Sequence, residues 1–482
     1  MKELIDYALK NGFLLHPTAL SYLQQMEGPL DILKQLKSQN QDILFLDRNL
    51  IEHYLKQGRK DEATLEKKVV KFEHDLKIVF DITGNSTCEG ELSDFHQYFL
   101  NRYEKLHRLL KQRKEMAAAV PINRVGLTLG DTALIGMVSN IRETKNGRKI
   151  ITVEDKTGSI DLFFNENTHC PHPVLNDEVI GVVGRPSQDG ERLHVDEIIH
   201  PDVPYRGRKQ NRASGNVAVA FVSDTHFGSN TFLKKEWDRF LCWLNGDGDY
   251  TREERELAKK IKYIVMPGDL VDGIGIYPNQ DKELEILDIY EQYKFAAEEL
   301  DRVPEDIKII IQPGNHDAVR MAEPQPALPE KIQKLFKRKN VVFTGNPSEF
   351  LLEGVRVLSY HGKSMNDFDR AVKEFKIKDP MPIMKSMLKR RHLVPMYGAS
   401  TQLAPEHEDY LVIEDIPDIF VTGHVHSAGH SIYKGVLLIN ASCWQAQTEY
   451  QKMMNFVPDP AKVPVVNLRD FRVNILNFSK TS

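Results

Sequence analysis

Hydrophobic positions recur with a helical period in the first 60 residues. Between residues 4 and 9, and again between residues 30 and 36, leucine, isoleucine and alanine follow the spacing of one helix face. We interpret residues 1–60 as a small helical interaction domain. A charged, β-forming stretch at 65–85 then passes into a Ser/Thr/Gly segment, and an amphipathic helix follows with Ser93 or Asp94 as its cap. Residues 61–120 are therefore predicted to be a linker and a helix.

The pattern changes to short alternating strands over residues 121–205. Segments such as RKIITVEDKTGSIDLFF and ERLHVDEII alternate apolar and polar residues, and turns such as Lys156-Thr157-Gly158 separate them. Closely spaced strands of this kind favour a small barrel of the oligonucleotide-binding (OB) type. Such a barrel could contact nucleic acid, or it could only hold subunits together, and the pattern leaves both interpretations open.

Residues 216–482 show a third pattern, in which continuous apolar runs end in polar motifs. Runs such as VAVAFV, IKYIVMP and IKIIIQP are rich in Val and Ile, as expected for strands buried on both faces of a sheet. Amphipathic helical segments lie between them, for example at 284–300. Polar residues that follow such strands are expected to converge at one edge of the sheet, where α/β folds place their sites.

The strand-end motifs contain the residue types that bind divalent metals. They are Asp224-Thr225-His226, Gly268-Asp269, Gly314-Asn315-His316-Asp317, His361-Gly362 and Gly423-His424-Val425-His426. Imidazole, carboxylate and carboxamide groups suit Mn²⁺ best here, with Mg²⁺, Fe or Zn²⁺ as alternatives, and the lack of thiolates argues against a structural zinc site. One carboxylate such as Asp269 can bridge two cations, and two adjacent cations can promote phosphoester hydrolysis. We therefore predict a two-metal phosphoesterase site.

His316 has a different predicted role from its neighbours. It follows the candidate ligand Asn315 directly, and it is not needed as a ligand itself. It is free to stabilise the transition state or to protonate the leaving oxygen. Asp317 could orient this imidazole, or it could only cap the turn.

The composition of the chain limits how it can bind nucleic acid. Its net charge of −5 gives no global basic signature, so any contact with nucleic acid needs a local patch or a basic partner. One candidate patch lies in residues 206–215, which we interpret as a basic linker between domains that could also follow DNA phosphates, and another is 389–391. The basic residues of the linker are Arg206, Arg208, Lys209 and Arg212.

The remaining composition points to a reducing compartment. Four scattered cysteines without a CxxC pair do not suggest a disulfide framework or a zinc finger. The N-terminus does not read as a signal peptide, and no apolar run of about eighteen residues is present to cross a membrane. We expect a soluble, intracellular protein.

The order of the strand-end motifs resembles that of the calcineurin-like metallophosphoesterases. This resemblance implies a two-layered β-sandwich flanked by helices, with His316 as the catalytic histidine. It implies one metal on Asp224, His226, Asp269 and His426, and a second on Asp269, Asn315, His361 and His424. The protein-phosphatase branch has Arg and Glu at the positions of Gly273 and Asp317, so this sequence looks more like the nuclease of the double-strand-break repair complex.

The wider chain resembles the small subunits of archaeal family-D DNA polymerase. The segments GDLVDGIGIYP, IIIQPGNHDAVR, HGKSMNDF, RRHLVPMYG and INASCWQAQTEYQ carry this resemblance, which runs from about residue 120 to the C-terminus. It implies an α+β multidomain protein with an N-terminal helical region, an OB-like barrel and a phosphoesterase domain. It also implies a 3′–5′ proofreading exonuclease in the archaeal cytosol, partnered with a large catalytic subunit, with primer–template DNA and, through the complex, with a sliding clamp. Two alternatives remain: a catalytically silent scaffold subunit of a polymerase, and a stand-alone phosphatase.

Overall fold

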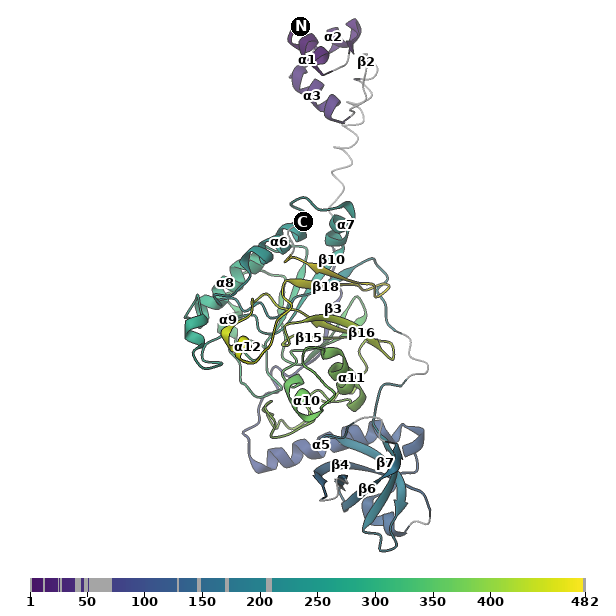
Figure 1. The fold of residues 1–482 in the computed structure, drawn as a ribbon. Helices are drawn as coiled ribbons and strands as arrows, with labels where there is room; N and C mark the ends of the chain where they lie inside the picture. The colour runs from purple at the N-terminus through teal and green to yellow at the C-terminus, as the bar shows by residue number, and fades with distance from the viewer. Residues whose placement is uncertain are drawn as a thin grey trace. The chain divides into compact units, whose positions relative to one another are not determined.

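The computed structural model describes residues 2–11, 14–24, 26, 28–39, 45–46, 51, 72–127, 130–144, 149–169, 173–204 and 210–479. Contacts divide the chain into two units, Met1–Phe72 and Glu73–Ser482 (Figure 1). The first unit contains the helices that the periodicity predicts. Its elements are α1 (Lys2–Lys10), β1 (Leu14–Leu15), α2 (Pro17–Leu23), α3 (Pro29–Gln39) and β2 (Phe45–Leu46). Leu4, Ala8, Leu23 and Leu33 form a small core, so the apolar face of each helix is covered within the unit.

The second unit contains a closed five-stranded barrel, as the alternating pattern predicts. Its strands are β4 (Thr132–Glu143), β5 (Lys149–Asp155), β6 (Gly158–His169), β7 (Val179–Pro186) and β8 (Arg192–Ile199), in the order β4-β5-β6-β8-β7. Alternate residues such as Leu134, Val153 and Leu162 fill its interior. The short 3₁₀ helices η1 (Lys114–Met116) and η2 (Ile122–Leu127) lead into it.

Part of the segment that we expected to be a linker belongs to the phosphoesterase fold. Strand β3 (Leu76–Asp81) pairs with β13 (Ser348–Leu352) in an antiparallel ladder, so it forms the edge of a sheet whose other strands lie more than 260 residues later. The alternation of KIVF is a genuine strand signal, but its partner is too distant in sequence to be predicted. The predicted helix is present as α5 (Leu92–Lys111), with Glu91 as its N-cap in place of Ser93 or Asp94.

Two six-stranded sheets form the centre of the second unit. The first has the order β12-β11-β10-β9-β18-β19 and the second the order β16-β17-β15-β14-β13-β3. The first sheet is built from β9 (Ala218–Phe221), β10 (Ile261–Pro267), β11 (Lys308–Gln312), β12 (Val341–Phe343), β18 (Lys462–Asn467) and β19 (Val473–Asn477). The second adds β14 (Val355–Tyr360), β15 (Ile419–Thr422), β16 (Ala428–Tyr433) and β17 (Val436–Ala441) to β3 and β13.

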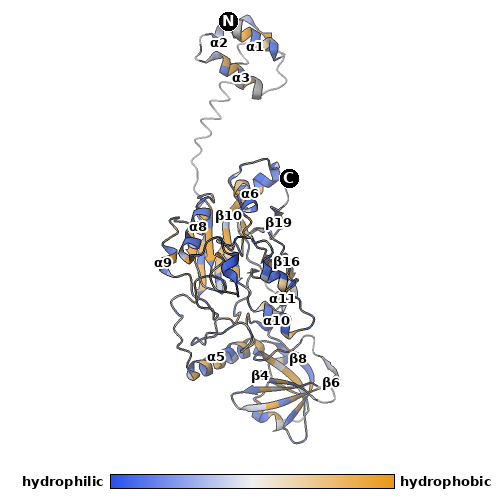
Figure 2. Cartoon of the chain, turned by 60° about the vertical axis from the view of Figure 1, so that its left-hand side comes forward, coloured by the Kyte–Doolittle hydropathy of each residue, from blue (hydrophilic) through white to orange (hydrophobic). Residues whose placement is uncertain are grey.

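Helices cover the outer face of each sheet. Apolar residues of α6 (Lys234–Asn245) and α8 (Ile289–Asp301) pack on the first sheet, and those of α10 (Met365–Ala371) and α11 (Pro380–Arg390) pack on the second. Figure 2 shows the consequence, since β10 is largely hydrophobic while α6 and α8 carry hydrophilic residues beside hydrophobic ones. The shorter helices are α7 (Arg252–Lys260), η3 (Gln280–Glu283), α9 (Glu330–Gln333) and α12 (Glu449–Met453). Among the described residues, no helix has the length and apolar character needed to span a bilayer.

The connectivity of the sheets determines where the polar motifs meet. Strands β9, β10 and β11 run parallel in the first sheet, and β14 and β15 run parallel in the second. Their carboxyl ends therefore lie at common sheet edges, as the strand-end motifs predict. Every predicted metal ligand follows one of these five strands.

Candidate metal centre

Tight turns position the candidate ligands at the ends of the central strands. Each of five predicted ligands has a positive φ, between 44° and 66°, a region that side chains other than glycine rarely adopt. Such strain persists only where the surrounding structure imposes it, and it concentrates at functional sites. These residues are Asp224, His226, Asp269, His424 and His426.

Glycines in the motifs let the backbone approach the ligands closely. A Cβ at Gly314 would lie 2.2 Å from Oδ1 of Asp269, and one at Gly268 would lie 2.3 Å from Nδ1 of His361. A Cβ at Gly423 would lie 2.5 Å from Oδ2 of Asp224. The glycines at positions 268, 314 and 423 are therefore a packing requirement of the site.

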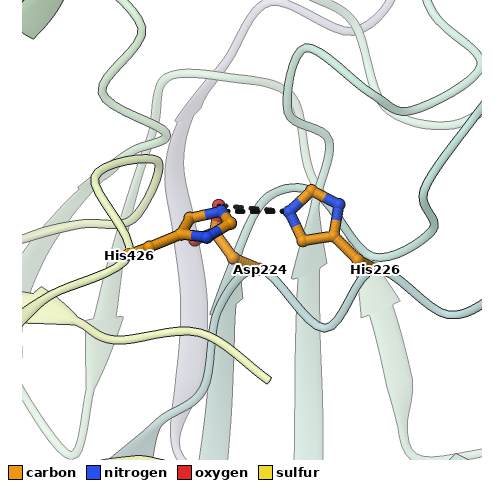
Figure 3. Close-up of side chains that lie close together, drawn as sticks. All are labelled: Asp224, His226 and His426. Carbon is orange, nitrogen blue, oxygen red and sulfur yellow. Dashed lines mark hydrogen bonds and ion pairs between the residues drawn. The ribbon is translucent and has the colours of Figure 1, made fainter. Parts of the chain in front are cut away.

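The first donor cluster consists of Asp224, His226 and His426, all of them buried (Figure 3). The Nε2 atoms of His226 and His426 face each other at 3.1 Å, and Oδ1 of Asp224 lies 3.4 Å from Nε2 of His426. The two imidazoles follow strands of different sheets and have their Nε2 atoms turned toward one point. Two imidazoles and a carboxylate that converge in this way form a donor set that can hold a divalent cation.

Two residues outside the predicted set hold the histidines of this cluster in place. Oδ1 of Asp272 lies 3.0 Å from Nδ1 of His226, and Nε2 of Gln451 lies 3.1 Å from Nδ1 of His426. Asp272 can accept the Nδ1–H of His226 and so leave Nε2 of that ring for a metal, whereas the amide of Gln451 fixes the orientation of the His426 ring. Both residues lie in segments that carry the polymerase-subunit resemblance, GDLVDGIGIYP and INASCWQAQTEYQ, but neither was predicted as a site residue.

The second donor cluster consists of Asp269, His361 and His424, with Asn315 beside them. Nε2 of His361 lies 3.3 Å from Oδ2 of Asp269 and 3.0 Å from Oδ1 of Asn315. Its Nδ1 lies 2.9 Å from the carbonyl oxygen of Pro267, to which it can donate. With Nδ1 directed at this carbonyl, the Nε2 atom of His361 faces the carboxylate of Asp269.

Asn366 holds the remaining histidine of the second cluster. Its side-chain amide lies 2.7 Å from Nε2 of His424, while the backbone N–H of His424 donates to Oδ2 of Asp224 at 2.9 Å. The two donor clusters are thus linked through Asp224 as well as through Asp269.

Asp269 lies between the two clusters. Its Oδ2 is 3.3 Å from Nε2 of His361 on one side and 3.9 Å from Nε2 of His226 on the other. The side chain is almost completely buried, and its Oδ1 accepts the backbone N–H of His316 at 2.8 Å. This position is the one that a carboxylate shared by two cations would need.

His316 lies at the rim of the site and keeps some solvent exposure. Its Nδ1 is 2.7 Å from the carbonyl oxygen of Asp272, so it can donate there and leave Nε2 facing the site, 3.9 Å from Oδ2 of Asp269. Asp317 accepts hydrogen bonds from the N–H groups of Leu270 and Gly314, both on its Oδ2 atom. Of the two roles considered for Asp317, the geometry supports the turn cap.

Burial and charge separate the pKa values of the site. Burial acts to raise the pKa of Asp269, but the neighbouring histidines, His361 first among them, together outweigh it and hold that pKa well below its ordinary value. Burial lowers the pKa of His424 to about 3. Burial opposes protonation of His361, yet the charge of Asp269 raises its pKa to about 9. The ionised carboxylate is ready to bind a divalent cation, and a cation that binds the imidazoles displaces their protons.

The described residues of the predicted basic patches make structural contacts away from the site. Arg206, Arg208 and Lys209 lie outside the described residues. Arg212 lies over the ring of Phe471 at 5.4 Å and donates to a backbone carbonyl, so its guanidinium has structural contacts. The second candidate patch, 389–391, does not present its arginines to DNA, because Arg390 and Arg391 are buried against the barrel and its C-terminal connection.

The helix-flanked double sheet and its strand-end donors define the class of the protein: a calcineurin-like metallophosphoesterase fold, preceded by a closed OB-like barrel. The family model for the B subunits of DNA polymerases alpha and epsilon matches residues 219–430, a range that contains every predicted ligand. The DNA polymerase II small subunit of Archaeoglobus fulgidus is 44% identical over 430 residues, which cover 87% of this chain and 86% of that protein. That of Methanothermobacter thermautotrophicus is 39% identical over 479 residues, covering 97% and 98%. The chain belongs to the family of archaeal DNA polymerase II small subunits.

Among solved structures, an archaeal phosphodiesterase is 11% identical, with 54% of this chain and 99% of that chain covered and a TM-score of 0.28.

Proposed function

We propose that this chain is a metal-dependent phosphodiesterase that removes nucleotides from DNA in the 3′–5′ direction, as the proofreading exonuclease of an archaeal DNA polymerase. The observation that carries the proposal is the position of Asp269, whose Oδ2 lies within 3.9 Å of a histidine nitrogen in each of two donor clusters. A scaffold subunit does not need a buried ionised carboxylate that faces two donor clusters, and burying such a group costs free energy even when it is paired.

The donor sets fit two divalent cations. Asp224, His226, Asp269 and His426 would hold one, and Asp269, Asn315, His361 and His424 would hold the other. Their oxygen and imidazole atoms suit Mn²⁺ first, with Mg²⁺, Fe or Zn²⁺ as alternatives. When bound, such a pair polarises the phosphoryl oxygens and supplies hydroxide at neutral pH.

The chain's own groups provide the remaining chemistry. The Nδ1 atom of His316 donates to the carbonyl of Asp272, so Nε2 faces the site, and in the imidazolium form of the ring Nε2 carries a second proton that can pass to the departing oxygen of the DNA strand. Asp272 and Gln451 hold the imidazoles of the first cluster at fixed angles.

We also propose that the chain acts with a large catalytic polymerase subunit in the archaeal cytoplasm. The relatives are named as small subunits, which supports a larger partner. DNA with an unpaired 3′ end would be the substrate, and a sliding clamp would be reached through the complex.

The first prediction tests the shared carboxylate. Asp269→Ala should abolish Mn²⁺-dependent shortening of 5′-labelled single-stranded DNA and reduce bound metal from two equivalents toward none, because both cations lose a ligand. The matched control is His430→Ala, since this histidine is exposed on β16 and close in sequence to the motif. Activity is followed on sequencing gels and metal content by elemental analysis.

Other outcomes separate the alternatives. If Asp269→Ala still shortens DNA at a near-normal rate, Asp269 is not the carboxylate that bridges the two cations. A wild-type chain that binds metal but never shortens DNA, alone or with its large subunit, would favour the silent scaffold. Release of phosphate from phosphomonoesters without cleavage of DNA would favour a phosphatase.

A further inference from the structure

Aromatic rings surround the part of the site that holds His316 and His426. The ring of Tyr277 lies 6.4 Å from that of His316, and the ring of Phe456 lies 6.4 Å from that of His426. Tyr450, from α12, stacks on Tyr277 with ring centroids 5.1 Å apart and an interplanar angle of 26°. The proposed phosphodiesterase chemistry uses none of these three rings.

The stacked pair is attached to the site through named contacts. The next residue of α12, Gln451, contacts Nδ1 of the candidate ligand His426, so the segment that presents Tyr450 is held by the metal centre itself. Glu283 accepts the hydroxyl of Tyr277 at 2.9 Å and the backbone N–H of Glu449 at 3.2 Å. One carboxylate therefore fixes both halves of the pair.

The outer ring of the pair is open to solvent. Tyr450 is 40% exposed, and the neighbouring Met453 and Val457 are 76% and 66% exposed. The charges that accompany this surface are the carboxylate of Glu283 and the ion pair of Glu449 with Lys452, a net negative set that disfavours direct contact with a phosphate backbone. An uncharged planar group is a more favourable partner for the exposed ring of Tyr450 than a phosphate.

We propose that Tyr450, supported by Tyr277, is a stacking platform for the unpaired nucleobase next to the scissile phosphodiester of single-stranded DNA. The inference rests on the proposed function for its substrate and goes beyond it in naming how the substrate is held. A base has a π-face whatever its identity, so stacking of this kind is tolerant of sequence. The phosphate then lies over the metal centre while its base rests on the adjacent rings.

When the base stacks on Tyr450, the contribution of the ring to binding free energy depends on the presence of the base. A double-mutant cycle measures this coupling. Fluorescence anisotropy of a 5′-labelled oligothymidylate gives its affinity for the complete chain in EDTA and low salt, where the DNA is not cut. The second DNA carries an abasic nucleotide at its 3′ end. Tyr450→Ala should weaken binding of the normal DNA by about 5- to 150-fold, the range for one stacked base, and should leave binding of the abasic DNA unchanged.

Two control variants keep the experiment specific. Tyr450→Phe retains the ring and should bind the normal DNA as the wild type does. Tyr290→Ala removes a comparably exposed tyrosine from α8, 46% exposed, and should have no effect on either DNA. Equal thermal midpoints for all variants exclude unfolding.

The outcomes are distinct. Equal losses on both DNAs, or no loss on either, would overturn the platform. Weakened association of Tyr450→Ala with the large subunit, without any dependence on the base, would show that this surface binds protein. If the base and ring are coupled but the wild-type chain never cleaves DNA, the platform stands and only the exonuclease proposal fails.

Discussion

His316 differs from the other residues of the site in that it reaches the centre from the rim. Its ring makes one short contact, with a backbone carbonyl, and its Nε2 atom remains available. Apart from the partly buried His424, the predicted ligands are buried and are held by several partners, whereas His316 has 14% of its side chain exposed. This separation suits a residue that exchanges a proton with substrate.

The second prediction follows from that difference. His316→Ala should reduce turnover by about 10²- to 10⁴-fold, the usual contribution of a general acid, while metal content stays at the wild-type level. Steady-state kinetics on single-stranded DNA and elemental analysis of the same preparation measure both. Loss of one metal equivalent would instead make His316 a ligand.

The third prediction concerns the glycine that packs on Asp269. Gly314→Ala should lower metal affinity by about 10- to 100-fold, because the new Cβ would displace the shared carboxylate. Gly215→Ala is the matched control, since its Cβ would only reach ordinary contact with Val217 at 3.5 Å. Titration with Mn²⁺ compares the two variants, and equal affinities would refute the packing argument.

At the scale of elements, helix α5 joins the barrel to the phosphoesterase sheets through a buried charge network. Nε of Arg102 donates to Oδ2 of Asp409 at 2.6 Å, and Nε2 of His392 lies 2.8 Å from the same oxygen. Arg102 is fully buried and also donates to the carbonyl of Pro395. Burial acts to raise the pKa of Asp409, but His392 and Arg102 outweigh it and hold that pKa well below its ordinary value.

The fourth prediction uses the pH dependence of this network. A depressed pKa means that Asp409 stabilises the fold above pH 3.8, and that this contribution is lost as the pH falls toward the folded-state value. Asp409→Asn should therefore destabilise the second unit by about 3–5 kcal/mol near neutral pH, since the charge of Arg102 stays buried. The gap between the melting temperatures of variant and wild type should narrow below pH 4. A gap that stays constant down to pH 3 would contradict this account.

At the scale of the whole molecule, charge limits what the chain does alone. A net charge of −5 opposes DNA binding, which depends largely on neutralising phosphates. Two arginines of one candidate patch are buried in the structure, which reduces the basic surface further.

The fifth prediction is that the isolated chain binds primer–template DNA weakly at physiological salt, whereas its complex with the large subunit has a high affinity for the same DNA. Affinity of the isolated chain should also fall steeply as salt increases. Anisotropy titrations with and without the large subunit, at two salt concentrations, test this. Equal affinities of the isolated chain and the complex would show that the small subunit itself supplies the affinity for DNA.

The sequence by itself determined the chemistry of the site. The motifs that follow the Val- and Ile-rich runs contain every donor that the two clusters bring together, because parallel strands of a buried sheet place their carboxyl ends side by side. The barrel and the first helices were equally predictable, since alternation and helical periodicity are local properties of the chain.

Only the tertiary structure decided which residues support that chemistry and how the elements close around it. Gln451, Asn366 and the stacked pair of Tyr277 and Tyr450 contact the site from loops and a short helix, where no periodic pattern marks them. Strand β3 completes a sheet with partners more than 260 residues away, and the arginines of segment 389–391 are buried by a domain that precedes them in sequence. These features depend on contacts between distant segments, and hydrophobic patterning records only whether a residue is buried, not what buries it.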